Sequence, residues 1–125
     1  MNVLVVDDQD VIRETLQTAL DDEGFTVECA SNGREALDIL ARWKPCVILL
    51  DLMMPVMDGW AFRAEQQRVG NTVPIVLLSA AGELDRYQEK LNAAAIIPKP
   101  FDLDRVISAI EGVCERRATP RPARA

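Results

Sequence analysis

Five polar residues that could perform phosphoryl chemistry each stand at or just after the end of a short apolar run. They are Asp7, Asp8, Asp51, Ser79 and Lys99. Where such runs form neighbouring strands of a parallel sheet, their ends meet at one edge, and three carboxylates brought together there would repel one another. A cluster of this kind persists most readily around a cation. Because it offers oxygen ligands and no His or Cys, it favours Mg²⁺, with Mn²⁺ or Ca²⁺ as alternatives.

The two remaining groups complete the requirements of phosphoryl transfer. Lys99 would supply a fixed positive charge, and the Ser79 hydroxyl would supply a hydrogen-bond donor for the transferred group. Asp51 is the best candidate for the nucleophile because it ends the central run, between the acidic pair on one side and Ser79 with Lys99 on the other. The residue types and their order therefore predict a carboxylate that accepts a phosphoryl group.

The elements that must position these residues are predicted from the apolar pattern. Five runs indicate strands: residues 3–6, 25–29, 46–50, 73–78 and 95–97. Five helix-prone stretches alternate with them: residues 10–20, 36–40, the stretch after 58–59, the stretch between Ser79 and Lys99, and residues 103–113. Strict alternation predicts an α/β fold with a parallel sheet and helices on both faces. Pro98, near the end of the last strand, favours an edge position for that strand.

Local signals mark the ends of these helices. Gly24 follows the first helix, residues 31–33 open the second, and Asp102 is placed to cap the last one. Asp58 with Gly59 is better interpreted as a helix start than as a ligand. Asp8 taken alone could also serve only to begin the first helix, where a carboxylate is favourable at the positive end of the helix dipole.

Length and composition limit the class of protein. The chain has 125 residues, enough for one domain, which we expect to span residues 1–117, with residues 118–125 as a flexible tail or truncated linker rich in Pro, Arg and Ala. The chain contains no histidine, so imidazole bases and Ser-His-Asp chemistry are excluded. The sequence shows no charged leader and no long apolar run, from which we expect a cytoplasmic protein without a membrane span.

The charge and the cysteines give two further expectations. The net charge is −6, and without four arginines in the last ten residues it would be −10, so direct nucleic-acid binding by the folded body is not expected. The three cysteines, Cys29, Cys46 and Cys114, are an odd number without metal-like spacing. We expect three reduced, mostly buried thiols.

Four motifs carry a resemblance to a known family. They are Asp7 and Asp8 after Val5 and Val6, the segment DLMMPVMDG at residues 51–59, Leu78-Ser79-Ala80, and Lys99-Pro100-Phe101. In this order, each at a predicted strand end, they resemble the receiver domains of two-component response regulators over residues 1 to about 117. The resemblance implies a flavodoxin-like, doubly wound sheet of five parallel strands in the order 2-1-3-4-5, with five helices.

The resemblance also implies a role for each site residue. Asp51 would be the phosphorylated aspartate, Asp7 and Asp8 would hold Mg²⁺ together with Asp51, and the backbone carbonyl of Met53 would be a further metal ligand. Ser79 and Lys99 would contact the phosphoryl group, and the peptide between Lys99 and Pro100 would be cis. The phosphodonor would be a phosphohistidine on a sensor histidine kinase or a phosphotransfer protein. Such a module promotes only its own phosphorylation and dephosphorylation and is not otherwise an enzyme.

The sequence departs from the common receiver pattern at three positions. Ile96 stands where many receivers have the Tyr or Phe that moves inward together with the Ser79 position on phosphorylation, so this switch lacks its aromatic member. Met53 and Ala81 offer no side chain that could orient an attacking water. We therefore expect slow self-dephosphorylation.

Two other functions compete with a phosphoacceptor module. A metal-dependent phosphohydrolase with an aspartyl phosphate would want a second acid two residues after the nucleophile, where this chain has Met53. A receiver-like protein-interaction module that acts without phosphorylation is the other alternative, and Ile96 leaves room for it. If the chain is a signalling module, with or without phosphorylation, its output is a downstream protein or an output domain outside this sequence. The sequence does not decide whether phosphorylation would produce a dimer.

Overall fold

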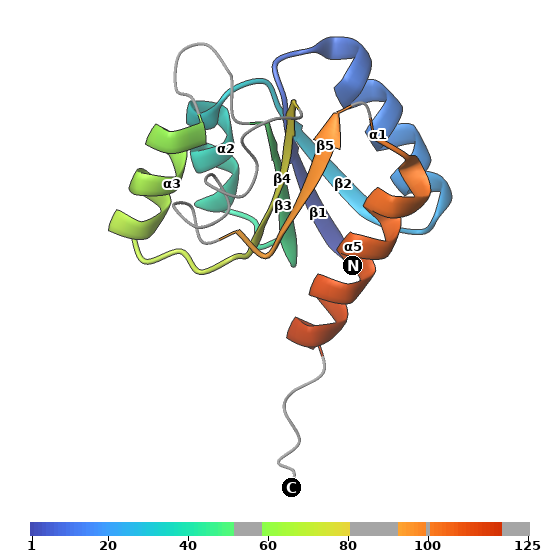
Figure 1. Cartoon of the computed structure of the whole chain (residues 1–125). Coiled ribbons are helices and arrows are strands. Elements are labelled where there is room, and N and C mark those ends of the chain that lie inside the picture. Colours follow the sequence, from blue (N-terminus) through green and yellow to red (C-terminus); the bar gives the residue numbers. More distant parts are fainter. Residues whose placement is uncertain (52–58, 81–92, 100, 119–125) are drawn as a thin grey trace, which may run out of the picture.

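The structure is a computed structural model that describes residues 1–51, 59–80, 93–99 and 101–118. In this part of the chain a five-stranded sheet is flanked by four helices (Figure 1). In chain order the elements are β1 (Asn2–Val6), α1 (Asp10–Asp22), β2 (Thr26–Ala30), α2 (Gly33–Leu40), β3 (Val47–Asp51), α3 (Gly59–Arg68), β4 (Ile75–Ala80), β5 (Ala95–Lys99) and α5 (Leu103–Ala118). The fourth of the five expected helices falls in residues 81–92, outside the described part.

All neighbouring strands of the sheet are parallel, in the order β2-β1-β3-β4-β5. This confirms the predicted α/β class and strand order. β5 is an edge strand, as the position of Pro98 predicts. The order places β1 and β3 side by side in the centre, so the residues that follow these two strands come out next to each other.

The strands bury both faces of the sheet, which explains why their sequences are almost continuously apolar. On one face, alternate strand residues such as Val5, Leu49 and Leu78 pack with residues of α1 and α5. On the other face, residues such as Leu4, Leu50 and Leu77 pack with residues of α2 and α3. Figure 1 shows the two helix layers on opposite sides of the sheet. None of the helices in the described part of the chain has the length and apolar character needed to cross a bilayer.

The helix boundaries have local causes that the sequence signals predicted. After α1 the chain turns at Gly24, whose φ of 92° lies in the left-handed region that glycine adopts at little cost. The side chain of Asn32 accepts a hydrogen bond from the backbone N–H of Glu35 at 2.9 Å and caps α2. Asp102 does the same for α5, accepting from the N–H of Asp104 at 2.9 Å.

A buried glutamine fixes the connection from α3 to β4. The side chain of Gln66 is fully buried, and its amide nitrogen donates to the Asn71 side chain at 2.9 Å and to the Val73 carbonyl at 3.0 Å. Arg63 donates to the Gln66 side-chain oxygen at 2.7 Å. These bonds satisfy a polar group that would be costly to bury unpaired, and they hold the segment that leads into β4.

The expectation of three reduced thiols is wrong for two of the cysteines. Cys46 and Cys114 form a disulfide, with their Cα atoms 5.2 Å apart, within the usual range for such a bond. The bond joins residues that are 68 positions apart, so it depends on how α5 packs against the sheet and not on any local spacing. Cys29 is a free, partly buried cysteine.

Candidate functional site

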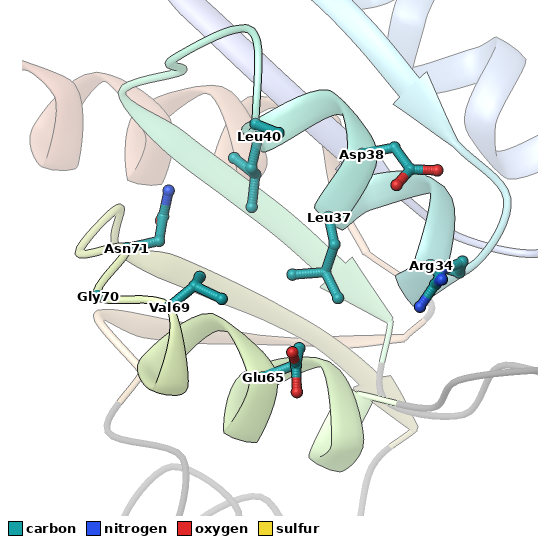
Figure 2. A pocket seen from close by; sticks show the side chains of 9 residues that line it. Arg34, Leu37, Asp38, Leu40, Glu65, Val69, Gly70 and Asn71 are labelled. Carbon is teal, nitrogen blue, oxygen red and sulfur yellow. The ribbon is translucent and has the colours of Figure 1, made fainter.

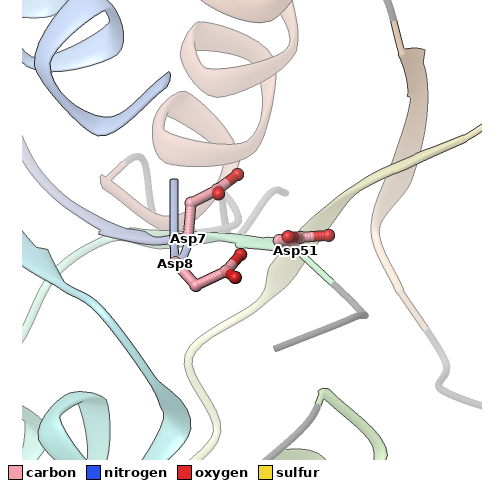
Figure 3. Close-up of side chains that lie close together, drawn as sticks. All are labelled: Asp7, Asp8 and Asp51. Carbon is pink, nitrogen blue, oxygen red and sulfur yellow. The ribbon is translucent and has the colours of Figure 1, made fainter. Parts of the chain in front are cut away.

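Three aspartates gather at the carboxyl ends of the two central strands. Each of Asp7, Asp8 and Asp51 places one carboxylate oxygen within 4.8 Å of the others. Asp7 is fully buried and Asp51 is 6% exposed, whereas Asp8 is exposed. Figure 3 shows the three side chains reaching the same region from the chain just after β1 and from the end of β3. The predicted convergence of these residues is therefore confirmed, although their roles are not tested by geometry.

The register of the sheet explains why these carboxylates meet. Val6 of β1 is paired with Leu50 of β3, so the next residues, Asp7 and Asp51, emerge beside each other. The N–H of Asp7 donates to the Ala30 carbonyl at 3.1 Å, which continues the pairing toward β2 for one residue beyond β1. The Asp7 carboxylate then accepts from the N–H of Gln9 at 2.9 Å and turns the chain into α1.

One contributor to this site was not identified from the sequence. Arg13, in the first turn of α1, donates from its guanidinium to the backbone carbonyl of Asp7 at 2.7 Å and also pairs with the Asp10 carboxylate. The bond ties α1 to the chain that carries the acidic pair. The only signal in the sequence is an arginine one helical turn after the start of the predicted helix, which is common on solvent-exposed helix faces.

The donor set of the cluster fits a hard divalent cation. Three carboxylates at this separation repel one another strongly, the more so because two of them are almost completely buried. Oxygen ligands without nitrogen or sulfur are the set that Mg²⁺ and Ca²⁺ take in proteins. The three aspartates could therefore hold a metal ion of this kind.

The other predicted site residues are only partly described. Ser79 and Lys99 lie at the ends of β4 and β5, where Ser79 is paired with Pro98 and Ala80 with Lys99, but their side chains lie outside the described part of the structure. Met53 and Pro100, and with them the predicted carbonyl ligand and cis peptide, also fall outside it. Ile96 on β5 is partly buried and packs against the α2 and α3 side of the core.

A hollow in the surface lies away from Asp7, Asp8 and Asp51. It is a groove of about 540 Å³ between α2 and α3, and Figure 2 shows side chains from both helices pointing into it. Leu37 and Val69 form part of its apolar lining, and Arg34, Asp38 and Glu65 give it charges of both signs. Of the predicted site residues whose side chains are described, Asp7, Asp8 and Asp51 do not line this groove.

Comparison with known proteins identifies relatives over almost the whole chain. The family model described as the response regulator receiver domain matches residues 3–111. The response regulator MprA of Mycolicibacterium vanbaalenii is 37% identical over 122 residues, which is 96% of this chain and 52% of that protein. The regulatory protein AtoC of Escherichia coli is 40% identical over 106 residues, 83% of this chain and 23% of that protein. The chain thus spans about half the length of MprA and 23% of the length of AtoC.

Solved structures give the same result for the fold. The Francisella response regulator 1452 receiver domain matches with a TM-score of 0.86 and 28% identity, covering 93% of this chain and 98% of that one. The Vibrio cholerae chemotaxis protein CheY4 matches with a TM-score of 0.81 and 32% identity, covering 90% of this chain and 97% of that one.

Proposed function

Because the chain belongs to the response regulator receiver domain family, we propose that Asp51 accepts a phosphoryl group from a phosphohistidine and that the resulting charge alters a protein-binding surface. The observation that supports this most directly is the meeting of Asp7, Asp8 and Asp51 at the ends of the two central strands. This is the arrangement in which a nucleophilic carboxylate lies beside a cation site.

In the proposed reaction, a carboxylate oxygen of Asp51 attacks the phosphorus atom of the donor. The new phosphorus–oxygen bond forms as the phosphorus–nitrogen bond to the donor imidazole breaks, and the imidazole leaves with the electron pair of that bond. Asp51 is positioned for this step by its place as the last residue of β3, where it is held by strand pairing to β4. Its exposure of only 6% limits the access of competing water to the nucleophile.

Mg²⁺ is the proposed cofactor, and when bound it would neutralise negative charge on the transferred group. Asp7, Asp8 and Asp51 would hold it, with the backbone carbonyl of Met53 as a further ligand. Asp7 is fixed for this purpose from two sides, by the hydrogen bond from Gln9 to its carboxylate and by that from Arg13 to its carbonyl.

Ser79 and Lys99 are proposed to contact the transferred phosphoryl group. Their support is the sheet order, because β4 and β5 lie in sequence beyond β3 on the side away from β1. Lys99 would pair with the phosphoryl charge, and the Ser79 hydroxyl would donate a hydrogen bond to it. Ser79 and Ile96 would then form the switch that carries the change to the surface around β5.

The proposed partners follow from the same chemistry. Upstream we infer a sensor histidine kinase or a histidine phosphotransfer protein, acting in the cytoplasm. Downstream the receiver would act on another protein or on an output domain of a longer regulator, and the protein would act as an enzyme only on its own aspartyl phosphate. Direct nucleic-acid binding by this domain is not proposed, because the chain carries a net charge of −6.

The intact mass of the protein after incubation with a small acyl phosphate and Mg²⁺ tests the proposal. We expect a gain of one phosphoryl group that requires Mg²⁺ and is abolished by Asp51→Asn. Asp38→Asn is the matched control, because it removes the same charge from an exposed position on α2 and should leave the adduct intact.

Two results would overturn the proposal. An adduct that persists in Asp51→Asn would assign phosphorylation to another residue. No adduct with an acyl phosphate, and no Mg²⁺-dependent complex with beryllofluoride, would favour the alternative of a receiver-like interaction module that works without phosphorylation. We retain this alternative because the switch position holds Ile96, which is partly buried, and not an aromatic residue.

A further inference from the structure

A covalent bond ties the last helix to the amino-terminal end of the central strand. Cys46 stands immediately before β3, and Cys114 lies in α5. Asp51 ends β3 five residues after Cys46, so the disulfide lies at the opposite end of the sheet from the acidic cluster, about 16 Å away along the strand. The disulfide is therefore separate from the candidate phosphoryl site, and that site does not explain its role.

The two cysteine residues differ in how far they are exposed to solvent. Cys114 is completely buried in the core between α1, α5 and the sheet, whereas Cys46 is partly exposed. The backbone N–H of Cys46 donates to the Asn2 carbonyl at 2.8 Å, which holds Cys46 beside β1. Because Cys46 is the only one of the two residues that is exposed to solvent at all, a dissolved thiol or disulfide has to approach the pair from the side of Cys46.

The surroundings accommodate the two cysteines without the bond as well. The Sγ atom of Cys46 lies 3.2 Å from the Asn2 carbonyl oxygen, which a reduced thiol can use as an acceptor. Cys114 is surrounded by apolar residues, where a thiol behaves as a small hydrophobic group. In addition, Val106, Ile110 and Val113 hold α5 on the sheet by their own burial. Loss of the disulfide therefore removes one restraint on α5 but leaves its packing in place.

We propose that Cys46 and Cys114 form a reversible thiol–disulfide site, reached through Cys46, that locks and releases the last turns of α5. The co-reactant is a low-molecular-weight disulfide of the glutathione class. Its sulfur is attacked by the Cys46 thiolate, which forms a mixed disulfide and releases one thiol. The Cys114 thiolate then attacks the Cys46 sulfur, closes the internal bond and releases the second thiol. Two protein protons and two electrons thus pass to the co-reactant, and excess thiol reverses both steps.

Cys29 is a natural internal control. It lies on β2, is partly buried, and forms no disulfide. Burial raises the pKa of its thiol, which lowers the share of reactive thiolate at neutral pH. Reversible disulfides in reducing compartments are characteristically redox-sensing rather than structural. The inference does not depend on phosphorylation of Asp51.

The test follows the three thiols of the full chain through reduction and oxidation. The reduced protein is incubated with glutathione disulfide, its remaining thiols are alkylated under denaturing conditions, and the labelled residues are mapped by mass. We expect a loss of two hydrogen atoms, with alkylation at Cys29 only. Cys29→Ser should form the internal bond unchanged. Cys114→Ser should instead retain one glutathione on Cys46, because no second thiolate displaces it.

Reversal is measured on the folded, oxidised protein with an excess of a small dithiol in the absence of denaturant, and circular dichroism verifies that both forms are folded. We expect both thiols to become alkylatable, and the oxidised form to unfold at a higher denaturant concentration than the reduced form. Equal labelling of all three cysteines after oxidation would overturn the proposal. A bond that the dithiol reduces only after unfolding would also overturn it, since that bond would be a fixed cross-link.

Discussion

Arg13 donates a hydrogen bond of 2.7 Å from its guanidinium to the backbone carbonyl oxygen of Asp7, and this bond joins the first turn of α1 to the residue that follows β1. The acceptor belongs to a fully buried residue, so losing the donor leaves a buried carbonyl with one charged partner fewer. Hydrogen bonds to charged groups contribute about 1.5–3 kcal/mol. We expect Arg13→Met to lower the free energy of unfolding by about 2 kcal/mol, measured by urea denaturation.

Arg68 provides the comparison for this variant. It also belongs to an i,i+3 ion pair, with Glu65 on α3, but its side chain is 69% exposed against 19% for Arg13. Exposed pairs of this kind contribute little to stability, because water and salt screen them. Arg68→Met should therefore lower the free energy of unfolding by less than half as much as Arg13→Met. Equal decreases would show that the bond to Asp7 stabilises the protein no more than an exposed ion pair does.

Because of the acidic cluster, we expect the removal of one negative charge there to stabilise the metal-free protein. In the absence of divalent cations, the carboxylates of Asp7, Asp8 and Asp51 repel one another across less than 4.8 Å. Each such pair costs about 1–3 kcal/mol, depending on how well the surroundings screen it. Asp51→Asn keeps the shape of the side chain and removes its charge, so we expect it to stabilise the metal-free protein by about 1–3 kcal/mol in urea denaturation.

Added Mg²⁺ should reverse this order. The ion binds the folded wild type and stabilises it, because only the folded chain assembles the cluster, while Asp51→Asn should gain less. Asp38→Asn, on the exposed face of α2, should change neither value by more than about 0.5 kcal/mol. If Mg²⁺ stabilises Asp51→Asn as much as the wild type, Asp51 does not contribute to a metal site.

The sequence was sufficient for the fold because the three central strands, β1, β3 and β4, are buried on both faces. Val5, Leu49 and Leu78 face one helix layer, and their neighbours in the chain face the other, so the apolar runs reported the strands almost directly. The errors lie at the ends. Phe25 was included in the second strand, but it is a buried residue that precedes β2. Hydrophobicity reports burial, and burial extends beyond the hydrogen-bonded ladder.

The candidate site, too, contains features that the sequence predicted and features that it did not. Convergence of Asp7, Asp8 and Asp51 was predictable, because it follows from parallel pairing and from the positions of these residues at the strand ends. The bond from Arg13 to Asp7 was not, since a helix-surface arginine has many possible partners. The Cys46–Cys114 disulfide was not predictable either, because it requires the packing of α5 against β3 across 68 positions of sequence.

The start of α2 predicts a pH dependence of stability. The Glu35 carboxylate accepts hydrogen bonds from the N–H and the hydroxyl of Ser31, at 2.8 and 2.9 Å. The backbone bond, followed by the hydroxyl bond, lowers the pKa of Glu35 in the folded state below its ordinary value. A lowered folded-state pKa stabilises the protein at pH values above the ordinary pKa, and this stabilisation is lost as the pH falls through the lowered folded-state pKa.

Glu35→Gln isolates this contribution. We expect the variant to be less stable than the wild type at pH 7 and to approach it at pH 3, with a difference kept below about 1 kcal/mol by solvent screening, because the carboxylate is exposed. Melting temperatures at the two pH values measure it. Glu14→Gln, which removes an exposed charge from α1, serves as the control for net charge. A stability gap that is the same at both pH values would contradict the assignment.

The lifetime of the proposed aspartyl phosphate depends on whether a side chain can orient the attacking water. Met53 stands two residues after Asp51, and its thioether is neither a strong hydrogen-bond donor nor a strong acceptor. The water molecule that hydrolyses the aspartyl phosphate is then not oriented by the side chain at position 53. Because such a water attacks slowly, we expect a long-lived phosphoryl group. Met53→Glu and Met53→Asn each introduce a group that can hold a water molecule. We expect either variant to shorten the half-life of the phosphorylated protein by roughly a factor of ten, followed by intact mass after removal of the donor.

Met57→Asn provides the matched control for this change. It introduces the same amide six residues after Asp51, so the polarity of the segment changes while position 53 stays a methionine. If the two asparagine variants shorten the half-life equally, the cause is a general opening of the site to water. If neither shortens it, alignment of water at position 53 does not limit hydrolysis, and the rate is set by how far the burial of Asp51 excludes water from the phosphorus atom.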